Sequence, residues 1–421
     1  MKTYVFAGAS QRALGMYCKP MLADYTDVCK IVGVFDANPG RAAQFVKECG
    51  GDFPVYESFE EMIAATHPDR VIVTTTDVYH SDYIIKAMEL GCDVITEKPM
   101  TTTDDRCRAI LETEKRTGKK VIVTFNYRYA PFMTRIKEII KSGAIGDVFS
   151  VHFEWLLTQN MDHGAHGTSY FRRWNARMAM SSGLLVHKST HHFDLVNWWL
   201  GDKPARVSAF GKLNMYGAKN APWDDVKTPG MTCRKCPHAA ECKFRYDITD
   251  FEKGYYAAQE DKGEKVPHGS IGLKDQCIYA SDIDIYDTMA VTVEYAGGAV
   301  MSYSLNATTP YEGWRVVFNG SKGRIEATNY ETGIQAKAPE NHIKVFDLQD
   351  NITDYAIAKS TGGHGGGDIR LRNMVFRENV PDPLGHAAGT EDGAYSILVG
   401  VAANKSIKEG TIVSIEDLLK D

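Results

Sequence analysis

The feature that most constrains this fold is a regular alternation of short β-rich runs and amphipathic stretches in the first part of the chain. The predicted strands are Tyr4–Ala7, Ile31–Phe35, Val71–Thr74, Val94–Thr96 and Val121–Thr124. Helical patterns separate them, among them Arg41–Cys49, Tyr83–Leu90 and Asp104–Thr117. Strands that alternate with helices in this way form a parallel sheet with helices on both faces. We therefore predict a doubly wound α/β domain over residues 1–125.

After Asn126 the pattern changes to one in which strands dominate. A helix at Phe132–Lys141, an extended run at Val148–Trp155 and a long helix at His187–Leu200 come first. The strands that follow are Arg206–Leu213, Met289–Tyr295, Val300–Leu305, Arg315–Asn319 and Arg324–Ala327, and the last helix is Ala394–Lys408. The hairpin-like Ala296-Gly297-Gly298 indicates antiparallel neighbours. Residues 126–421 are thus predicted to form an α+β domain with a large, mostly antiparallel open sheet, interrupted by an insertion at about 217–280.

The bulk composition limits the class of partner. At 421 residues the chain is too long for one core, and 43% hydrophobic with 24% charged residues is typical of an ordinary globular protein. The formal net charge of -6 argues against nucleic-acid binding, which needs a surplus of Lys and Arg. The chain enters its first strand at once, without room for a signal peptide, and no apolar run approaches the ~18 residues of a membrane span. We expect a cytoplasmic protein with a small-molecule partner and no nucleic-acid or membrane partner.

A glycine turn directly after the first strand indicates a dinucleotide site. Gly8-Ala9-Ser10-Gln11-Arg12-Ala13 is a variant of G-x-G-x-x-G/A with Ser at the second position. The second strand runs into Asp36, whose carboxylate can accept hydrogen bonds from ribose hydroxyls and would repel a 2'-phosphate, so NAD is predicted. Arg41 nearby could accommodate that phosphate, which leaves NADP open. The alternative is that these residues are a glycine turn and a capping Asp in another kind of βαβ protein.

A further motif lies at the carboxyl edge of the predicted sheet, where open α/β folds bind ligands. Val94–Thr96 runs into Glu97-Lys98-Pro99, and Pro99 sets the exit turn, with a cis peptide as one option. The glycine turn, Asp36, this tripeptide and Asn126-Tyr127-Arg128 together resemble the Gfo/Idh/MocA family of sugar and inositol oxidoreductases. The resemblance covers nearly the whole chain. It implies a Rossmann domain, a second domain with a large open sheet, a substrate pocket between them, and a homodimer or homotetramer.

The same resemblance extends to a histidine motif. The family has D-x-x-x-H-x-x-D on a helix of its second domain, and the matching segment here is 187–194, in which His187 replaces the first aspartate. His191 matches the catalytic histidine, and the i to i+4 spacing would place both rings on one helix face. Lys98 and His191 are therefore the predicted catalytic residues, with His191 as general acid/base. The alternative is that His191 and His192 are core residues over Trp198-Trp199.

The remaining site residues follow from the resemblance and from local chemistry. The predicted dinucleotide contacts are Gly8, Ser10, Gln11, Arg12, Ala13, Asp36, Arg41, Thr75, His80, Glu97, Lys98 and Asn126. The predicted substrate contacts are His187, Lys188, Arg128, Tyr129, Arg172, Trp174 and His364, with Arg173 beside them. His80 could equally be an ordinary loop residue. The arginines could equally form salt bridges at the surface. His364 lies among the five glycines of 361–368, where a flexible connector is the alternative.

Four cysteines stand apart from the other five, which look like reduced packing residues. Cys233 and Cys236 have the spacing of a zinc ligand pair, and Cys242 and Cys277 would complete a set of four thiolates. The rest of the spacing is irregular, so free thiols or disulfides remain alternatives. Structural zinc is the hypothesis; a catalytic metal is not expected, because all four ligands are sulfur.

Taken together, the sequence predicts an NAD-dependent oxidoreductase that acts on a secondary hydroxyl or ketone of a sugar, sugar derivative or cyclitol. Two other functions remain open at this point. One is a glycoside hydrolase that oxidises a sugar transiently with bound NAD, eliminates the aglycone and re-reduces the product. The other is a nucleotide-binding protein without turnover.

Overall fold

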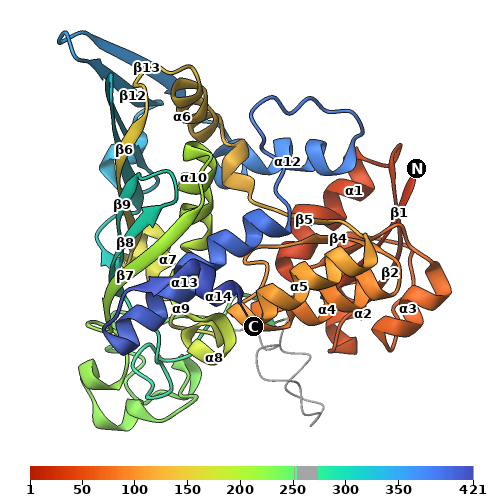
Figure 1. Ribbon diagram of the computed structural model, residues 1–421. Coiled ribbons are helices and arrows are strands. Elements are labelled where there is room, and N and C mark those ends of the chain that lie inside the picture. Colours follow the sequence, from red (N-terminus) through yellow and green to blue (C-terminus); the bar gives the residue numbers. More distant parts are fainter. Residues whose placement is uncertain (251, 254–273, 421) are drawn as a thin grey trace.

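The computed structural model describes residues 1–250, 252–253 and 274–420, and two sheets organise it (Figure 1). The first sheet is parallel throughout, in the order β2-β1-β3-β4-β5. Its strands are β1 (Lys2–Ala7), β2 (Cys29–Phe35), β3 (Arg70–Val73), β4 (Asp93–Thr96) and β5 (Val121–Val123). This confirms the doubly wound sheet predicted from the alternation. Of the predicted insertion at 217–280, residues 251 and 254–273 lie outside the described residues.

Helices cover this sheet, and local sequence sets where they begin and end. They are a π-helix η1 (Ala13–Cys18), α1 (Lys19–Asp24), α2 (Pro39–Cys49), α3 (Phe59–Thr66), α4 (His80–Glu89) and α5 (Asp104–Thr117). The side chain of Asn38 accepts a hydrogen bond from the Arg41 backbone N–H, which caps α2. Gly118 ends α5 in the left-handed conformation, as its sequence predicts.

The second sheet has nine strands in the order β13-β12-β11-β10-β6-β9-β8-β7-β14. They are β6 (Val148–Thr158), β7 (Pro204–Lys212), β8 (Thr288–Tyr295), β9 (Val300–Thr309), β10 (Gly313–Gly320), β11 (Gly323–Tyr330), β12 (Glu340–Asp347), β13 (Ile352–Ala358) and β14 (Val413–Ser414). Only β6 and β9 pair in parallel, and β8 and β9 form the predicted hairpin. Buried and exposed residues alternate along β6, β8 and β9, so one face of the sheet is in the core.

The helices of the second half lie mainly between the two sheets (Figure 1). They are α6 (Pro131–Lys141), α7 (His166–Ser169), α8 (Met178–Ser181), α9 (Gly183–His187), α10 (Thr190–Leu200), α12 (Gly367–Phe376), α13 (Thr390–Glu409) and α14 (Ile415–Leu419). Among the described residues, no helix is both long and apolar enough to cross a membrane.

The structure corrects the predicted long helix at His187–Leu200, which is two helices, α9 and α10. The Lys98 ammonium donates to the backbone carbonyl of His187, 3.0 Å away. In an unbroken helix that carbonyl would accept from the N–H of His191. That N–H donates instead to the carbonyl of Lys188, at 3.3 Å. A lysine from the first sheet therefore takes the place of one helical hydrogen bond.

Two segments near the C-terminus connect the halves of the molecule. The ring of Phe376, at the end of α12, packs against the rings of Tyr4, Tyr17 and Tyr25. The backbone N–H of Val123 in β5 donates to the carbonyl of Ala388, just before α13. The carboxyl edge of the parallel sheet is thereby held against α9, α10 and the segment before α12.

Candidate active site

A cavity of about 500 Å³ lies at the carboxyl ends of the parallel strands, against α9, α10 and the glycine-rich segment. The predicted dinucleotide contacts that line it are Gly8, Ser10, Gln11, Arg12, Asp36, Arg41, Thr75, His80, Glu97, Lys98 and Asn126. Ala13 does not line it, because it is fully buried in η1. One continuous space thus runs from the end of β2 to the histidines of the second half.

The turn at Gly8 is tight enough to require glycine. Its φ is +98°, and a Cβ there would lie 2.8 Å from the Thr75 backbone nitrogen and 2.9 Å from the Thr74 carbonyl carbon. Ser10, which departs from the usual motif, accepts a hydrogen bond from the Ala13 N–H through its Oγ, at 3.1 Å. Ser10 therefore caps the following helix, and glycine at position 8 lets the turn pass close to the backbone that follows β3.

Asp36, at the end of β2, is held firmly in place. Its carboxylate accepts from the backbone N–H groups of Ala9, at 2.7 Å, and Asn38, at 2.8 Å. Arg41 donates to both carboxylate oxygens, at 2.9 and 2.6 Å. A carboxylate and a guanidinium therefore stand together where the adenosine ribose of a dinucleotide would lie.

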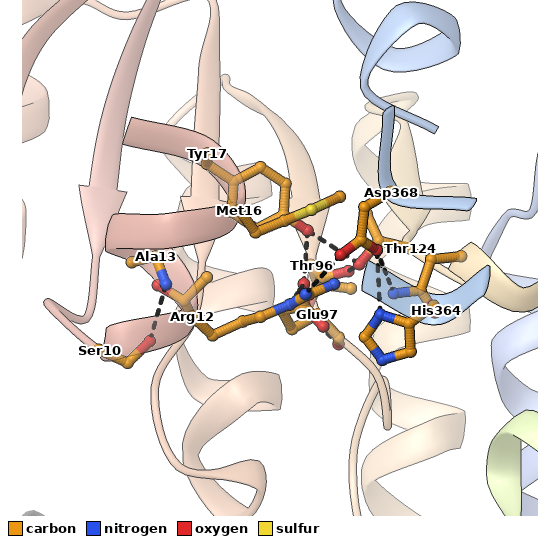
Figure 2. A network of polar contacts seen from close by, with 12 residues as sticks. Ser10, Arg12, Ala13, Met16, Tyr17, Thr96, Glu97, Thr124, His364 and Asp368 are labelled. Atoms are coloured by element: carbon orange, nitrogen blue, oxygen red, sulfur yellow. Dashed lines mark hydrogen bonds and ion pairs between the residues drawn. The ribbon is translucent and has the colours of Figure 1, made fainter. Parts of the chain in front are cut away.

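Arg12 links the nucleotide turn to the second half of the molecule (Figure 2). Its Nε donates to Glu97 Oε1 at 2.7 Å, and the Tyr17 hydroxyl donates to the same oxygen at 2.7 Å. Its Nη1 donates to Asp368 in α12, at 3.3 Å. Asp368 also accepts from His364 and from the amide of Asn126. These contacts fix the position of α12 relative to the motif residues Arg12 and Glu97.

Lys98 stands at the far end of the cavity, among charged groups from both halves. Burial lowers the pKa of its ammonium to about 8, although the nearby Asp77 carboxylate opposes the shift. The Lys98–Pro99 peptide is cis, which the sequence had left as an option. The side chain of Lys98 is therefore a cation that can give up its proton within an accessible pH range.

Asp77, which sequence reasoning missed, pairs with His187. Its Oδ2 lies 2.5 Å from the ring Nδ1 of His187, across a sequence separation of 110 residues. Burial lowers the pKa of His187, and Asp77 partly offsets this. Asp77 lies in the short η2 (Asp77–Tyr79) after β3, at the carboxyl edge of the sheet, and this position was the available signal.

His191 occupies a different environment from His187, although both line the cavity. Its ring packs edge-on against Phe125 and Tyr127, and its Nδ1 has no hydrogen-bond partner in the described part of the chain. Burial lowers its pKa far below the ordinary value, and the cation of Lys98 adds to that effect. Its neighbour His192 is a core residue, stacked on Trp155.

The predicted substrate contacts divide into two sets. His187, Trp174 and His364 line the cavity, together with Arg173 and Lys274. Lys188 lines a second cavity, which His364 also borders. The remaining three lie elsewhere.

Arg128, Tyr129 and Arg172 are buried away from both cavities, so the structure does not support the predicted sugar contacts. Arg128 forms a two-pronged ion pair with Asp194, and Tyr129 stacks on His386. Arg172 donates to the backbone carbonyls of Phe244 and Gln276. Each is occupied by partners inside the protein, which removes it from contact with a ligand.

The four predicted metal ligands converge on one small cavity. Cys233, Cys236, Cys242 and Cys277 line one cavity of about 20 Å³, and all four are free thiols. Over the ranges 1–250, 252–253 and 274–420, no group of three or more His, Cys, Asp or Glu is arranged to hold a metal ion. The structure has them as free thiols, one of the alternatives, and structural zinc stays a prediction.

The parallel sheet, the glycine turn and the polar cavity at the sheet edge are the features of a dinucleotide-binding protein. Residues 2–125 match the model of the oxidoreductase family's NAD-binding Rossmann fold, and residues 137–415 match that of its C-terminal alpha/beta domain. The chain belongs to the Gfo/Idh/MocA family of oxidoreductases.

Individual relatives agree with this assignment. YteT of Bacillus subtilis (strain 168) is 39% identical over 437 residues, covering 100% of this chain and 99% of YteT. The scyllo-inositol 2-dehydrogenase (NAD(+)) of the same organism is 29% identical over 200 residues, which cover 48% of this chain and 55% of that protein. An oxidoreductase from Agrobacterium radiobacter, solved with NAD+, L-tartaric acid and magnesium, shares the fold with a TM-score of 0.66 at 16% identity, covering 99% of both chains.

Proposed function

We propose that this protein oxidises a secondary hydroxyl of a sugar, sugar derivative or cyclitol with NAD, or reduces the corresponding ketone. The observation that carries the proposal is the meeting of Lys98, Asp77 and His187 at one end of the cavity that Gly8 and Asp36 border. Relatives named as inositol dehydrogenases support the substrate class.

The residues of the cavity fit a dinucleotide. The turn from Gly8 to Ala13 has the sequence and cavity position of a pyrophosphate site, and Asp36 places a carboxylate at the end of β2, which favours NAD over NADP. We propose that residues 1–125 bind NAD and that residues 126–421 supply most substrate contacts. Bound NAD would supply the hydride acceptor at the nicotinamide.

The substrate loses a hydride and a proton in this reaction. With a hydride acceptor bound, the carbinol C–H bond would break and its electron pair would leave with the hydrogen, while the O–H proton would go to the base and a C=O bond would form. Lys98 as a cation donates a hydrogen bond to the reacting oxygen and stabilises its developing negative charge. Because Nδ1 of His187 faces Asp77, Nε2 is the ring nitrogen that can accept the hydroxyl proton of the substrate.

The contacts favour His187 over His191 as the proton acceptor. A protonated His187 would be stabilised by the carboxylate of Asp77, in the way that an aspartate orients a catalytic histidine. In the described chain no carboxylate contacts His191, and the Lys98 cation opposes its protonation. The role that the resemblance assigns to His191 is therefore better proposed for His187, with His191 as a neutral contact to the substrate.

One experiment tests the proposed function against both alternatives. Purified protein is mixed with NAD and a panel of sugars, cyclitols and 3-keto-sugars, and absorbance of NADH is followed. A dehydrogenase accumulates NADH with its substrate. Release of an aglycone without net NADH would indicate the redox-assisted glycoside hydrolase, and binding of NAD without any turnover would indicate a non-catalytic protein.

The pH dependence of kcat/KM should be bell-shaped. Oxidation needs neutral His187, whose pKa lies below its ordinary value of 6.5, and protonated Lys98, whose pKa is about 8. The rate should rise as His187 loses its proton and fall about tenfold per pH unit once Lys98 loses its own. Initial rates of NADH formation across the pH range measure this, and a rate still rising above about pH 9 would contradict it.

Replacing Asp77 by Asn should lower kcat about 10²-fold and move both limbs of the pH profile to lower pH. Loss of the carboxylate removes the charge that favours the protonated forms of His187 and Lys98. Asp82→Asn, in the exposed first turn of α4, is the matched control and should leave the profile unchanged. A reduced kcat with unshifted limbs would assign Asp77 a merely structural role.

Three other expectations remain proposals. The apolar residues on the exposed face of the large sheet, among them Phe210 and Val300, fit an interface of a homodimer or homotetramer. The cytoplasm remains the expected compartment. Structural zinc at the four cysteines would be tested by metal analysis of the purified protein.

A further inference from the structure

A second cavity, of about 420 Å³, lies beside the active-site cavity on the side of the large sheet. His364 borders both spaces, and the ring of Tyr127 packs against His364 and His191 at centroid distances of 5.1 and 4.8 Å. The far wall comes from β10, β11 and the loop between β11 and β12. The proposed reaction at Lys98 and His187 leaves this volume unexplained.

The walls combine flat aromatic surfaces with polar groups. Tyr127, Phe132, Trp314 and Tyr330 provide rings, and Asn329, Asn341 and Glu331 provide donors and acceptors. Trp314 is 2% exposed, and its indole N–H has no hydrogen-bond partner in the residues the structure describes. That nitrogen is closed off from the cavity, so Trp314 presents ring atoms to this space and not its donor.

Lys188 is a second buried group that lacks a polar partner. It is 5% exposed, and its ammonium lies over the rings of Trp155, at 5.2 Å, and Tyr127, at 5.7 Å. Across the described chain, none of the hydrogen bonds or ion pairs involves that ammonium. Burying a cation in this way is unfavourable unless something in the cavity accepts its hydrogen bonds.

The groups around this space carry both signs of charge. Lys188 and Lys359 are cations, Glu331 lines the cavity, and the buried Glu312 accepts from His166 on its wall. Burial and the neighbouring Glu312 raise the pKa of Glu331 to about 7, so this carboxyl can donate as well as accept a hydrogen bond. A ring with several hydroxyls can exchange hydrogen bonds with these carboxyls and accept from Lys188. Its apolar face would stack on the aromatic side chains.

We propose that this second cavity binds an uncharged glycosyl unit joined to the ring that is oxidised, so that the substrate is a disaccharide or longer saccharide. This inference rests on the proposed function, which concerns the reacting ring, and it extends that proposal to the size of the substrate. The reacting ring would lie between Lys98, His187 and His364, and the second ring between Trp314 and Lys188. Contacts to a remote ring can help to position the reacting one.

The test places a large side chain in the second cavity and leaves the residues of the first cavity unchanged. Ala336 lines it and Ala338, two residues on, is exposed and does not. Ala336→Phe and the matched control Ala338→Phe are compared with the unaltered protein. Each is mixed with NADH and with cellobiose, maltose, lactose, glucose, galactose and a uronate-containing disaccharide, and binding is read from saturation transfer to the sugar protons by NMR. NADH formation with NAD is measured in parallel.

In the unaltered protein, we expect saturation transfer to protons of both rings of at least one neutral disaccharide. This transfer should be lost in Ala336→Phe and kept in Ala338→Phe. In the activity assay, Ala336→Phe should lower kcat/KM about tenfold or more for the disaccharide and leave that for a single ring nearly unchanged. Binding of single rings only, binding of the charged disaccharide only, or equal binding by both variants would overturn the inference. Two-ring binding without NADH formation would support the second cavity and count against the oxidoreductase proposal instead.

Discussion

Lys98→Met is expected to lower kcat/KM about 10²- to 10⁴-fold, the range for a lost acid–base or oxyanion-stabilising group. Met is unbranched and only one atom shorter than Lys, and it lacks the ammonium, so the reacting oxygen loses its cation. The Kd for NADH should change far less, because most of the predicted dinucleotide contacts lie along the rest of the cavity. Steady-state rates and titration of NADH fluorescence measure the two effects separately.

Lys120→Met is the matched control, since Lys120 is exposed just before β5 and borders neither cavity. It should match the unaltered protein in both measurements. The variant Lys98→Met also frees the carbonyl of His187, so its circular dichroism and unfolding midpoint should be recorded. A Lys98→Met protein that is folded, binds NADH and turns over at the original rate would refute the role proposed for Lys98.

Arg128→Met is expected to destabilise the fold by about 3–5 kcal/mol, the cost of leaving one charge of a buried ion pair uncompensated. Arg128 is 2% exposed and Asp194 1% exposed. Two hydrogen bonds, of 2.9 and 2.6 Å, join the guanidinium to the carboxylate. Unfolding in urea, followed by fluorescence and circular dichroism, measures the loss.

A double variant separates the charge from the packing. Arg128→Met with Asp194→Leu removes both buried charges and leaves Asp392, a second partner of Arg128 whose side chain is 40% exposed. The double variant should recover much of the lost stability, because replacing a buried pair by apolar side chains is often nearly neutral. Arg135, whose side chain is 39% exposed and paired with Glu138 within α6, supplies the control Arg135→Met, which should change stability by less than about 1 kcal/mol. A loss of that small size in Arg128→Met would show that the pair does not support the fold.

The case of Arg128 illustrates a general limit. The resemblance included Asn126-Tyr127-Arg128, and membership of the family is shown by matches over residues 2–125 and 137–415, on either side of this segment. Which of these side chains faces a ligand depends on the turn of η3 (Asn126–Tyr129), where Asn126 borders the cavity and Arg128 points to Asp194. A pattern of three neighbouring residues carries no information about those directions.

The sequence by itself determined the parallel sheet, the antiparallel second sheet and the edge at which Gly8, Asp36 and Lys98 meet. It could do so because hydrophobic periodicity and turn residues are local, and because parallel strands bring all their carboxyl ends to one edge. Only the tertiary structure decided the pairing of Asp77 with His187, the break between α9 and α10, and the second cavity beside His364. Each depends on atoms distant in the chain, whose approach is set by how the two sheets pack and not by any spacing along the sequence.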